Sequence, residues 1–419
     1  MQTRRVVITG VGAVTAIGLG RQGLWDGVLR GKSAVRTLQR FDPSPYRAHM
    51  AAEVDICMED YLERKQLRRL DRFAQFALIA AHMAVEDAGL VLTQESPETV
   101  GVSIGSALGG ITMAETQHQA YLQGGVKSVS PALALAVFGA SSSCNIAIAL
   151  GVTGPSTANS NSCSAGTVAL GDAFRLIRYQ QAEVMLAGGA EAPVTPLCFG
   201  AFDTIRAMST ANADPAIAYR PFDRQRDGFV MGEGAGILVL EELQHARARG
   251  ATILGEILGY GLTNDAHHMT APHPHGEPAA HAMRLALYEA GISPAMVGYI
   301  NAHGSATPLN DKTETLAIKR VFGEHAYTIP VSSTKPLFAH PFGATGAIEA
   351  AICSLALHHG YLPPTLNYAT PDPECDLNYL PNQGQYAQVE YILKNSFGFG
   401  GVNATLVLQR YDPERHETI

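Results

Sequence analysis

Cys163 is the residue of this sequence best placed for nucleophilic chemistry. It lies in the polar turn NSCSAG (161–166), and the helical stretch TVALGDAFRLI follows directly. A thiol at a helix N-terminus feels the positive end of the helix dipole, which favours the thiolate, and backbone N–H groups there can hold a thioester oxyanion. The turn therefore suits acyl transfer, although a buried inert cysteine is the alternative that the residue type leaves open.

Two histidines lie at the ends of predicted elements, in polar segments interrupted by glycine. His303 ends the predicted strand of YINAHG (299–304), and His340 follows SSTK (332–335) at the head of a helix rich in glycine and alanine. Either could be a structural hydrogen-bonding residue. Taken together with Cys163, however, they supply a nucleophile and two donors that can polarise a second carbonyl.

An α/β framework is predicted to position these side chains. Short β-rich runs alternate with helical stretches, which indicates sheets covered by helices. Two segments, SNSCSAGTVALGDAFRLI (160–177) and STKPLFAHPFGATGAIEAAICSLAL (333–357), share a local plan and suggest a duplicated half. We therefore expect one half over 1–251, which holds the cysteine, a second over 252–412, which holds the histidines, and a tail over 413–419. The β-rich runs are RRVVITG (4–10), TVGVSIG (99–105), AEVMLAGG (182–189) and AGILVLEEL (235–243), and the longest helical stretch spans 68–89.

Composition narrows the classes of function. The 419 residues are 46% hydrophobic and carry a formal net charge of −8, so nothing in the overall charge favours nucleic acid or an anionic membrane. The six cysteines form no C-x-x-C pair, which fits reduced thiols in a cytoplasmic protein. The apolar N-terminal run is broken by glycines and reads as a buried strand and turn, and no run of roughly 18 apolar residues predicts a membrane span.

Three other patterns point to chemistry only superficially. Gly10 and Gly12 follow a strand, but the third glycine of a dinucleotide fingerprint is absent, so we expect a tight turn. Ser103 fits G-x-S-x-G within an alternating strand, so we expect it to be structural. A group of histidines lies on a Pro-rich loop without a helical register, and we expect no metal site there. These histidines are His267, His268, His273 and His275.

Six long segments in order resemble the successive motifs of the elongating β-ketoacyl-acyl-carrier-protein synthases, and also those of the ketosynthase α subunits of type II polyketide systems. The resemblance covers nearly the whole chain. It implies a thiolase fold with duplicated αβαβα halves, a dimer, and acyl groups carried on the phosphopantetheine of an acyl carrier protein, with no further cofactor. The segments are GPSTANSNSCSAG (154–166), AEVMLAGGAEAP (182–193), RPFDRQRDGFVMGEGAG (220–236), YINAHGSATPLNDKTET (299–315), VSSTKPLFAHPFGATGAIEA (331–350) and NSFGFGGVNA (395–404).

The resemblance also implies roles for individual residues. Cys163 is then the acylated nucleophile, and His303 and His340 bind the malonyl thioester oxygen as carbon dioxide leaves. Lys335, paired with Glu349, orders the site. The remaining implied positions are a gate at Phe399, whose N–H joins that of Cys163 in the oxyanion hole; pantetheine contacts at Ser305 and Thr307; acyl-pocket walls at Leu108 and Phe202; and carrier-protein docking at Lys65, Arg68, Arg69 and Arg206.

The chain departs from the family pattern beside the catalytic positions. Asn161-Ser162 precede the cysteine, and Ala339 with Pro341-Phe342 flank the second histidine. These departures concern the acyl substrate and favour a specialised polyketide or polyene role over fatty-acid elongation. Two alternatives remain: a scaffold subunit that depends on a chain-length-factor-like partner in a heterodimer, and a non-decarboxylating thiolase, which needs a second catalytic cysteine.

Overall fold

The β-rich runs pair into one long mixed sheet in the computed structural model, which describes residues 4–413. The N-terminal half contributes, in spatial order, β6 (Ser156–Asn159), β5 (Val100–Gly105), β7 (Val184–Glu191), β9 (Gly234–Glu242) and β1 (Val6–Thr15). The C-terminal half contributes β12 (Val331–Ser332), β11 (Val297–Asn301), β15 (Tyr391–Gly398), β16 (Val402–Gln409) and β10 (Gly255–Asn264).

The two halves repeat one topology. The five strands of each half can be counted in chain order. In both halves the second of the five pairs in parallel with the third and the fourth, as β5 does with β6 and β7, and β11 with β12 and β15. The fourth then pairs antiparallel with the fifth, and the fifth with the first. Because β1 and β10 also pair antiparallel, from Val6↔Ile257 to Ile8↔Gly255, the sheet continues from one half into the other.

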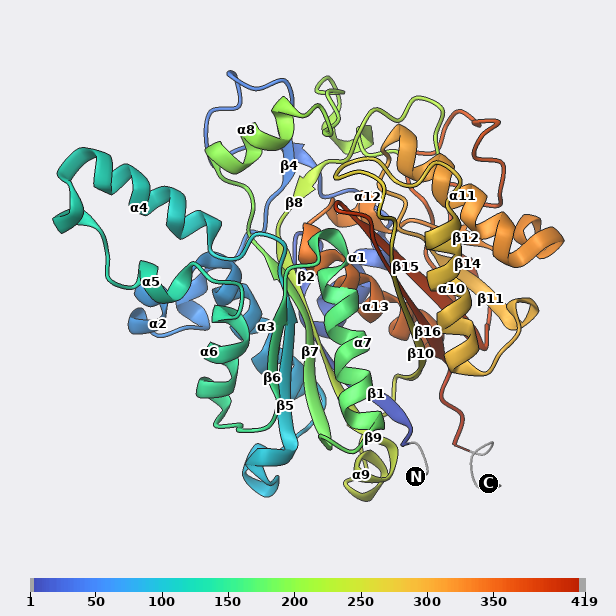
Figure 1. Ribbon diagram of the computed structural model, residues 1–419, viewed down its shortest axis with the longest axis horizontal. Helices are drawn as coiled ribbons and strands as arrows, with labels where there is room; N and C mark the ends of the chain where they lie inside the picture. The colour runs from blue at the N-terminus through green and yellow to red at the C-terminus, as the bar shows by residue number, and fades with distance from the viewer. Residues whose placement is uncertain (1–3, 414–419) are drawn as a thin grey trace.

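Helices complete a layered architecture (Figure 1). α3 (Arg72–Asp87) and α6 (Ser141–Leu150) cover the N-terminal half from outside, and α10 (Glu277–Ala290) and α11 (Pro308–Phe322) cover the C-terminal half. Between the halves, α7 (Ala165–Arg178) and α13 (Phe342–His359) pack against each other and against strands of both halves. This arrangement confirms the duplicated αβαβα fold.

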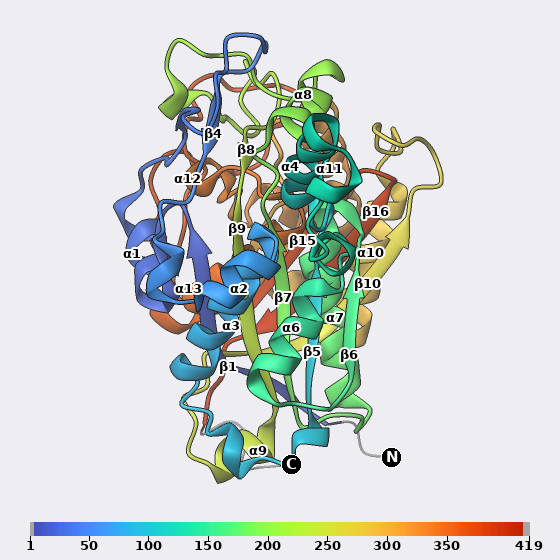
Figure 2. The same ribbon diagram turned by 90° about the vertical axis from the view of Figure 1, so that its left-hand side faces the viewer.

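Shorter elements extend from this framework. Figure 2 looks onto the side that carries α2, α4 and α6, and Figure 1 shows α4 reaching outward beyond the outer helices. These elements are α1 (Gly20–Arg30), α2 (Arg64–Arg69), α4 (Ile111–Gly124), α5 (Leu133–Ala136), α8 (Pro196–Thr204), α9 (Leu243–Ala248), α12 (Lys335–Phe338), β2 (Gly18–Leu19), β3 (Arg36–Thr37), β4 (Met50–Ala52), β8 (Met231–Gly232), β13 (Tyr361–Leu362) and β14 (Gln385–Tyr386).

The predicted turn at Gly10 and Gly12 is wrong, because both glycines lie inside β1. A Cβ at Gly12 would lie 1.8 Å from the backbone oxygen of Ala80, and one at Gly10 would lie 2.4 Å from that of Ala84. Both oxygens belong to α3. The glycines therefore allow a helix to pack directly on the strand, and a strand at this point offers no phosphate-binding turn.

Two other sequence expectations can be compared with the fold. Ser103 lies buried within β5, where its Oγ accepts a hydrogen bond of 3.0 Å from the Thr157 hydroxyl, so its structural role is confirmed. The helical stretch over 68–89 is divided at Asp71, whose carboxylate caps α3 by accepting from the Phe73 N–H at 3.0 Å. Within residues 4–413, no helix combines the length and the apolar character needed to cross a membrane.

Glycines bring the two central helices into direct contact. A Cβ at Gly166 of α7 would lie 2.7 Å from the backbone oxygen of Gly343 on α13. Reciprocally, a Cβ at Gly346 of α13 would lie 2.8 Å from the backbone nitrogen of Thr167 on α7. The expected nucleophile lies just before α7 and the second expected histidine just before α13. The contact between the helices therefore sets how closely the two can approach.

Replacing Gly166 tests this contact. In Gly166→Ala the new Cβ would meet backbone atoms, which cannot rotate away, so we expect a loss of about 1–3 kcal/mol in the free energy of unfolding. Denaturant titration measures the change. Gly139→Ala is the matched control, because its Cβ would meet only the Ser160 Oγ, at 3.4 Å. Equal stability of the two variants would show that the helices tolerate a wider spacing.

Candidate active site

Cys163 lies in a short 3-10 turn, Ser162–Ser164, between β6 and α7. Ser162 adopts a φ of 51°, so the chain bends sharply just before the cysteine. The thiol is buried, with 7% of the residue exposed, and the backbone N–H of Phe399 donates to its sulfur. Across the turn, a Cβ at Gly398 would lie 3.2 Å from the backbone nitrogen of Cys163. The turn and the segment around Phe399 therefore meet at the sulfur.

Burial decides the charge of this thiol in the free protein. Removal from water raises the pKa of Cys163 to about 11, although the Ser162 hydroxyl, the Lys335 cation and the Phe399 N–H act in the opposite direction. The sequence predicted that the helix N-terminus would favour the thiolate. The structure differs, because loss of hydration outweighs these groups, and the resting form is the neutral thiol.

His303 and His340 come together beside the cysteine. Their ring centroids lie 5.6 Å apart at 75°, and both rings line one cavity with Cys163. Burial and the nearby Lys335 cation hold the pKa of each imidazole well below its usual value. Both histidines are therefore neutral at physiological pH, and each neutral ring keeps one N–H to donate.

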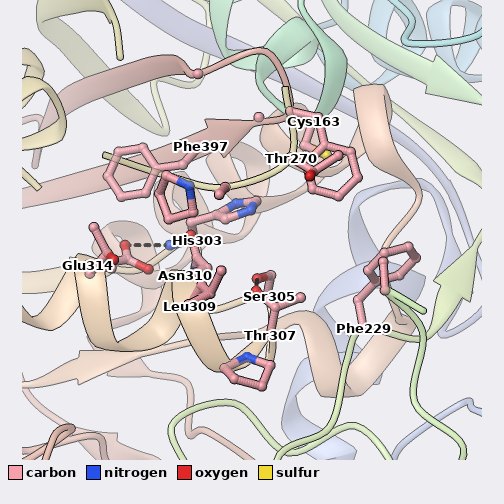
Figure 3. A pocket seen from close by; sticks show the side chains of 18 of the residues that line it. Cys163, Phe229, Thr270, His303, Ser305, Thr307, Leu309, Asn310, Glu314 and Phe397 are labelled. Carbon is pink, nitrogen blue, oxygen red and sulfur yellow. Dashed lines mark hydrogen bonds between the residues drawn. The ribbon is translucent and has the colours of Figure 1, made fainter. Parts of the chain in front are cut away.

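Two residues that the sequence analysis did not single out fix these histidines. The carboxylate of Glu314, on α11, accepts from the backbone N–H groups of His303 and Gly304, each at 2.8 Å (Figure 3). The Thr345 hydroxyl, on α13, lies 2.9 Å from Nδ1 of His340. If this hydroxyl donates to Nδ1, the Nε2 of His340 carries the proton and can donate to a ligand.

A buried ion pair between Lys335 and Glu349 holds the backbone of His303. Lys335 Nζ lies 2.6 Å from Oε1 of Glu349 and also donates to the backbone oxygen of His303. Lys335, Glu349 and a second lysine on β15, Lys394, are all 0% exposed. Sequence reasoning missed Lys394, because a lysine directly before the NSFGFGG segment carries no pattern of its own.

A cavity of about 290 Å³ leads to these groups. Ser305 and Thr307 lie on its wall, and their hydroxyl oxygens are 3.0 Å apart (Figure 3). Arg206, which is exposed, lies on the same wall. The structure thus places the two predicted pantetheine-contact residues and one of the predicted docking residues along one path to Cys163.

The predicted acyl-pocket residues lie in an apolar cluster that includes Cys163. Leu108 and Phe202 are partly buried and pack against it. The Phe202 ring stacks on that of Phe342, with centroids 4.6 Å apart. Glu191, at the end of β7, fixes the Leu108 segment because its carboxylate accepts from the Leu108 N–H at 3.1 Å and the Gly343 N–H at 3.0 Å. Burial raises the pKa of Glu191 to about 7.

The structure does not gather the four predicted docking residues in one place. Lys65, Arg68 and Arg69 are exposed on α2, which does not line the cavity, whereas Arg206 does. Both views place α2 away from α8, the helix that precedes Arg206 (Figures 1 and 2). One chain therefore presents two separate basic positions.

The histidine-rich loop borders the cavity. His268 lines it, and its Nδ1 accepts a hydrogen bond of 3.1 Å from the backbone N–H of Thr270. The rings of His267 and His275 lie near His273, with centroids 5.6 Å and 5.9 Å from it. In the described part of the chain, no three His, Cys, Asp or Glu side chains are arranged to hold a metal ion.

Comparisons with known proteins agree with this geometry. The family model "Beta-ketoacyl synthase, N-terminal domain" matches residues 3–246, and "Beta-ketoacyl synthase, C-terminal domain" matches residues 254–369. A 3-oxoacyl-[acyl-carrier-protein] synthase 2 of Synechocystis sp. is 46% identical over 98% of this chain and 99% of that protein. A protein of the same name from Staphylococcus aureus is 44% identical over the same shares of the two chains.

Solved structures share the whole fold. The ishigamide ketosynthase/chain length factor matches with a TM-score of 0.92 and 36% identity, and it covers 98% of this chain and 100% of that one. A ketosynthase in complex with its type II PKS acyl-carrier protein matches with a TM-score of 0.90, 37% identity and the same coverage. Together with the two matched domains, these relatives show that the chain belongs to the β-ketoacyl synthase family.

Proposed function

We propose that this protein is a β-ketoacyl-acyl-carrier-protein synthase, which joins an acyl group held on Cys163 to a malonyl unit by decarboxylative Claisen condensation. The observation that carries the proposal is the meeting of Cys163, His303 and His340 on the wall of one cavity. A nucleophile and two neutral donors at one cavity are what two successive thioester reactions need.

In the first step the sulfur of Cys163 attacks the thioester carbon of the acyl-carrier substrate. The thiol proton passes to the departing pantetheine sulfur, and a new thioester forms on the protein. The backbone N–H groups of Cys163 and Phe399 are the proposed donors to the tetrahedral oxyanion. The bend at Ser162 supports this role, because it presents the sulfur where the two N–H groups meet.

In the second step the bond between the malonyl carboxylate and its α-carbon breaks and carbon dioxide leaves. The electron pair moves into the thioester carbonyl, and N–H groups of His303 and His340 stabilise the enolate oxygen. The enolate carbon then attacks the acyl thioester on Cys163, and collapse of the adduct breaks the carbon–sulfur bond, releasing the β-ketoacyl product and the Cys163 thiolate, which takes a proton from solvent. Lys335 and Glu349 act through His303, whose backbone oxygen accepts from Lys335.

The two alternative functions are less well supported. A thiolase needs a second cysteine at the nucleophile, whereas Cys163 is the single thiol among the residues that line the cavity. A scaffold subunit needs no nucleophile, whereas this chain has Cys163 together with both histidines. The relatives from Synechocystis sp. and Staphylococcus aureus carry the proposed reaction in their shared name, 3-oxoacyl-[acyl-carrier-protein] synthase 2.

An acyl carrier protein is the proposed partner, because one related ketosynthase is solved in complex with such a protein. We further propose that a second chain covers the side that carries α4, α6 and the edge strand β6. Large apolar side chains are exposed there, including Leu122 (69%), Val126 (76%) and Ile148 (78%). The second chain is a copy of this one or a chain-length-factor-like subunit, and a cytoplasmic location remains a prediction.

Separate assays of the two steps test the mechanism. Cys163→Ala is expected to abolish acyl loading and condensation while retaining part of the malonyl decarboxylation, because both histidines remain. His303→Ala is expected to do the reverse: it loses decarboxylation and still accepts an acyl group. Intact mass spectrometry measures the acyl-protein adduct, and release of carbon dioxide measures decarboxylation. Full condensation by Cys163→Ala would overturn the proposal.

Charge reversal at the two basic positions tests carrier docking. Arg206→Glu and Arg68→Glu are each expected to raise the apparent KM for carrier-bound substrate several-fold at low salt, and less at high salt. Small pantetheine thioesters should react as before, which serves as the internal control. Because α2 does not line the cavity of its own chain, an effect of Arg68→Glu would place α2 at the entrance of a second chain. Equal losses with both substrate types would contradict a docking role.

Enlarging Leu108 tests the acyl pocket and the pathway that depends on it. Leu108→Phe fills space that the methylene groups of a long acyl chain would occupy. Each such group contributes about 0.8 kcal/mol when it is buried, so the loading rate should fall more for long acyl groups than for short ones. The rate of acyl-Cys163 formation across a chain-length series gives the answer. Leu29→Phe, on an exposed position of α1, is the control substitution. A uniform fall at every length would assign Leu108 to the core.

A further inference from the structure

Lys394 is a buried cation for which the reaction described above has no use. It lies in the middle of β15, points into the layer between the two halves, and is 0% exposed. A buried ammonium group is costly unless partners replace its water. Its Nζ donates to the Thr167 hydroxyl at 2.8 Å and to the Ser396 hydroxyl, and it lies 3.2 Å from Oε2 of Glu349.

These partners connect the elements that carry the reacting groups. Thr167 is on α7, one turn after the nucleophile, and Ser396 precedes Phe397 in the segment that leads to the gate at Phe399. Glu349 is on α13, one turn after Thr345, which bonds His340. The Glu349 carboxylate therefore lies between two lysines, with Oε1 at 2.6 Å from Lys335 and Oε2 at 3.2 Å from Lys394.

This arrangement gives the site an excess of positive charge. One carboxylate, Glu349, faces two ammonium groups, so it neutralises only one of them when both lysines are protonated. The other titratable groups near Lys394 are Cys353 on α13 and the two histidines. Glu314, which bonds Asn395 on the opposite face of β15, acts on Lys335 and so offsets part of this charge from the other side of the strand.

We propose that Lys394 is a positioning residue of the condensation, a second buried cation that shares Glu349 with Lys335 and keeps His303 and His340 in their neutral form. This inference rests on the proposed function. A protonated histidine has no lone pair left, so where the Thr345 hydroxyl donates to Nδ1 of His340, protonation of the ring would break that hydrogen bond. A cation that acts electrostatically on both rings opposes that protonation.

The charges of the site support this role. Burial lowers the pKa of Lys394 to about 8, with Glu349 opposing the shift. Below that pH the lysine is charged, and this range includes the one in which an ordinary histidine gains its proton. Lys394 acts on both imidazoles in the direction that lowers their pKa, whereas the cation that acts on the thiol of Cys163 is Lys335. Loss of Lys394 should therefore affect the histidines and spare the thiol.

Three variants at this position separate charge from packing. Lys394→Met removes the charge and the hydrogen bonds, Lys394→Gln removes the charge and keeps a donor, and Lys394→Arg keeps the charge. Two pH profiles are measured for each: decarboxylation of a malonyl-pantetheine thioester, which needs no carrier protein, and alkylation of Cys163 by iodoacetamide. Thermal unfolding reports on folding, and Cys353→Ala controls for a neutral change in the same buried layer.

In both neutral variants we expect the acid limb of decarboxylation to move up by roughly one pH unit, as loss of a nearby unit charge in a protein interior predicts. Lys394→Arg and Cys353→Ala should keep the wild-type limb, and the alkylation profile should not move in any variant. An unmoved acid limb in the neutral variants, or equal movement of both profiles, would overturn the proposal. So would failure of both neutral variants to fold, which would assign Lys394 to stability. Absence of decarboxylation in the wild-type protein would instead contradict the proposed function.

Discussion

The contact between α7 and α13 is the constraint on which the rest of the site depends. Each helix follows a reacting residue, so the spacing of the helices fixes the spacing of the thiol and the second histidine. That spacing is small because glycines at 166 and 346 let one backbone touch the other. The long sheet and the outer helices act on the site indirectly, since strands of both halves pack against these two helices and keep them in contact. Chemistry that needs two carbonyls in one small cavity follows from this packing.

Burial gives the site its electrical character. The thiol, both imidazoles, Glu349 and two lysines all lie out of contact with water or nearly so. Loss of hydration favours the neutral form of the thiol and of both imidazoles, and behind them Lys335, Glu349 and Lys394 contact one another directly. The outcome is a neutral thiol beside two neutral imidazoles, with cations behind them. Such an arrangement favours negative charge that develops on a substrate oxygen, because water is not there to compete.

Much of this could be predicted from the sequence, and the failures have physical causes. Cys163, His303 and His340 lie in long motifs at element ends, where a polar residue has few structural uses. Gly10 and Gly12 were misread because a glycine needed for close packing looks in sequence like a glycine needed for a turn. Lys394 and Glu314 escaped notice because a single charged residue in a strand or helix usually faces solvent, and only the assembled layers show that these two do not. The separation of α2 from Arg206 likewise depends on tertiary structure.

The seam between β1 and β10 limits how the protein can move during its cycle. The nucleophile comes from one half and the histidines from the other, an arrangement that in many enzymes allows a cleft to open and close. Here the halves share a hydrogen-bonded sheet, and helices packed through glycine lie across the same boundary. A hinge motion between the halves would break the hydrogen bonds between β1 and β10, so we expect the halves to move as one body. Entry of substrate and departure of product must therefore depend on the loops and side chains at the mouth of the cavity, while the shared sheet and the two central helices hold the backbone segments that carry the thiol and the imidazoles.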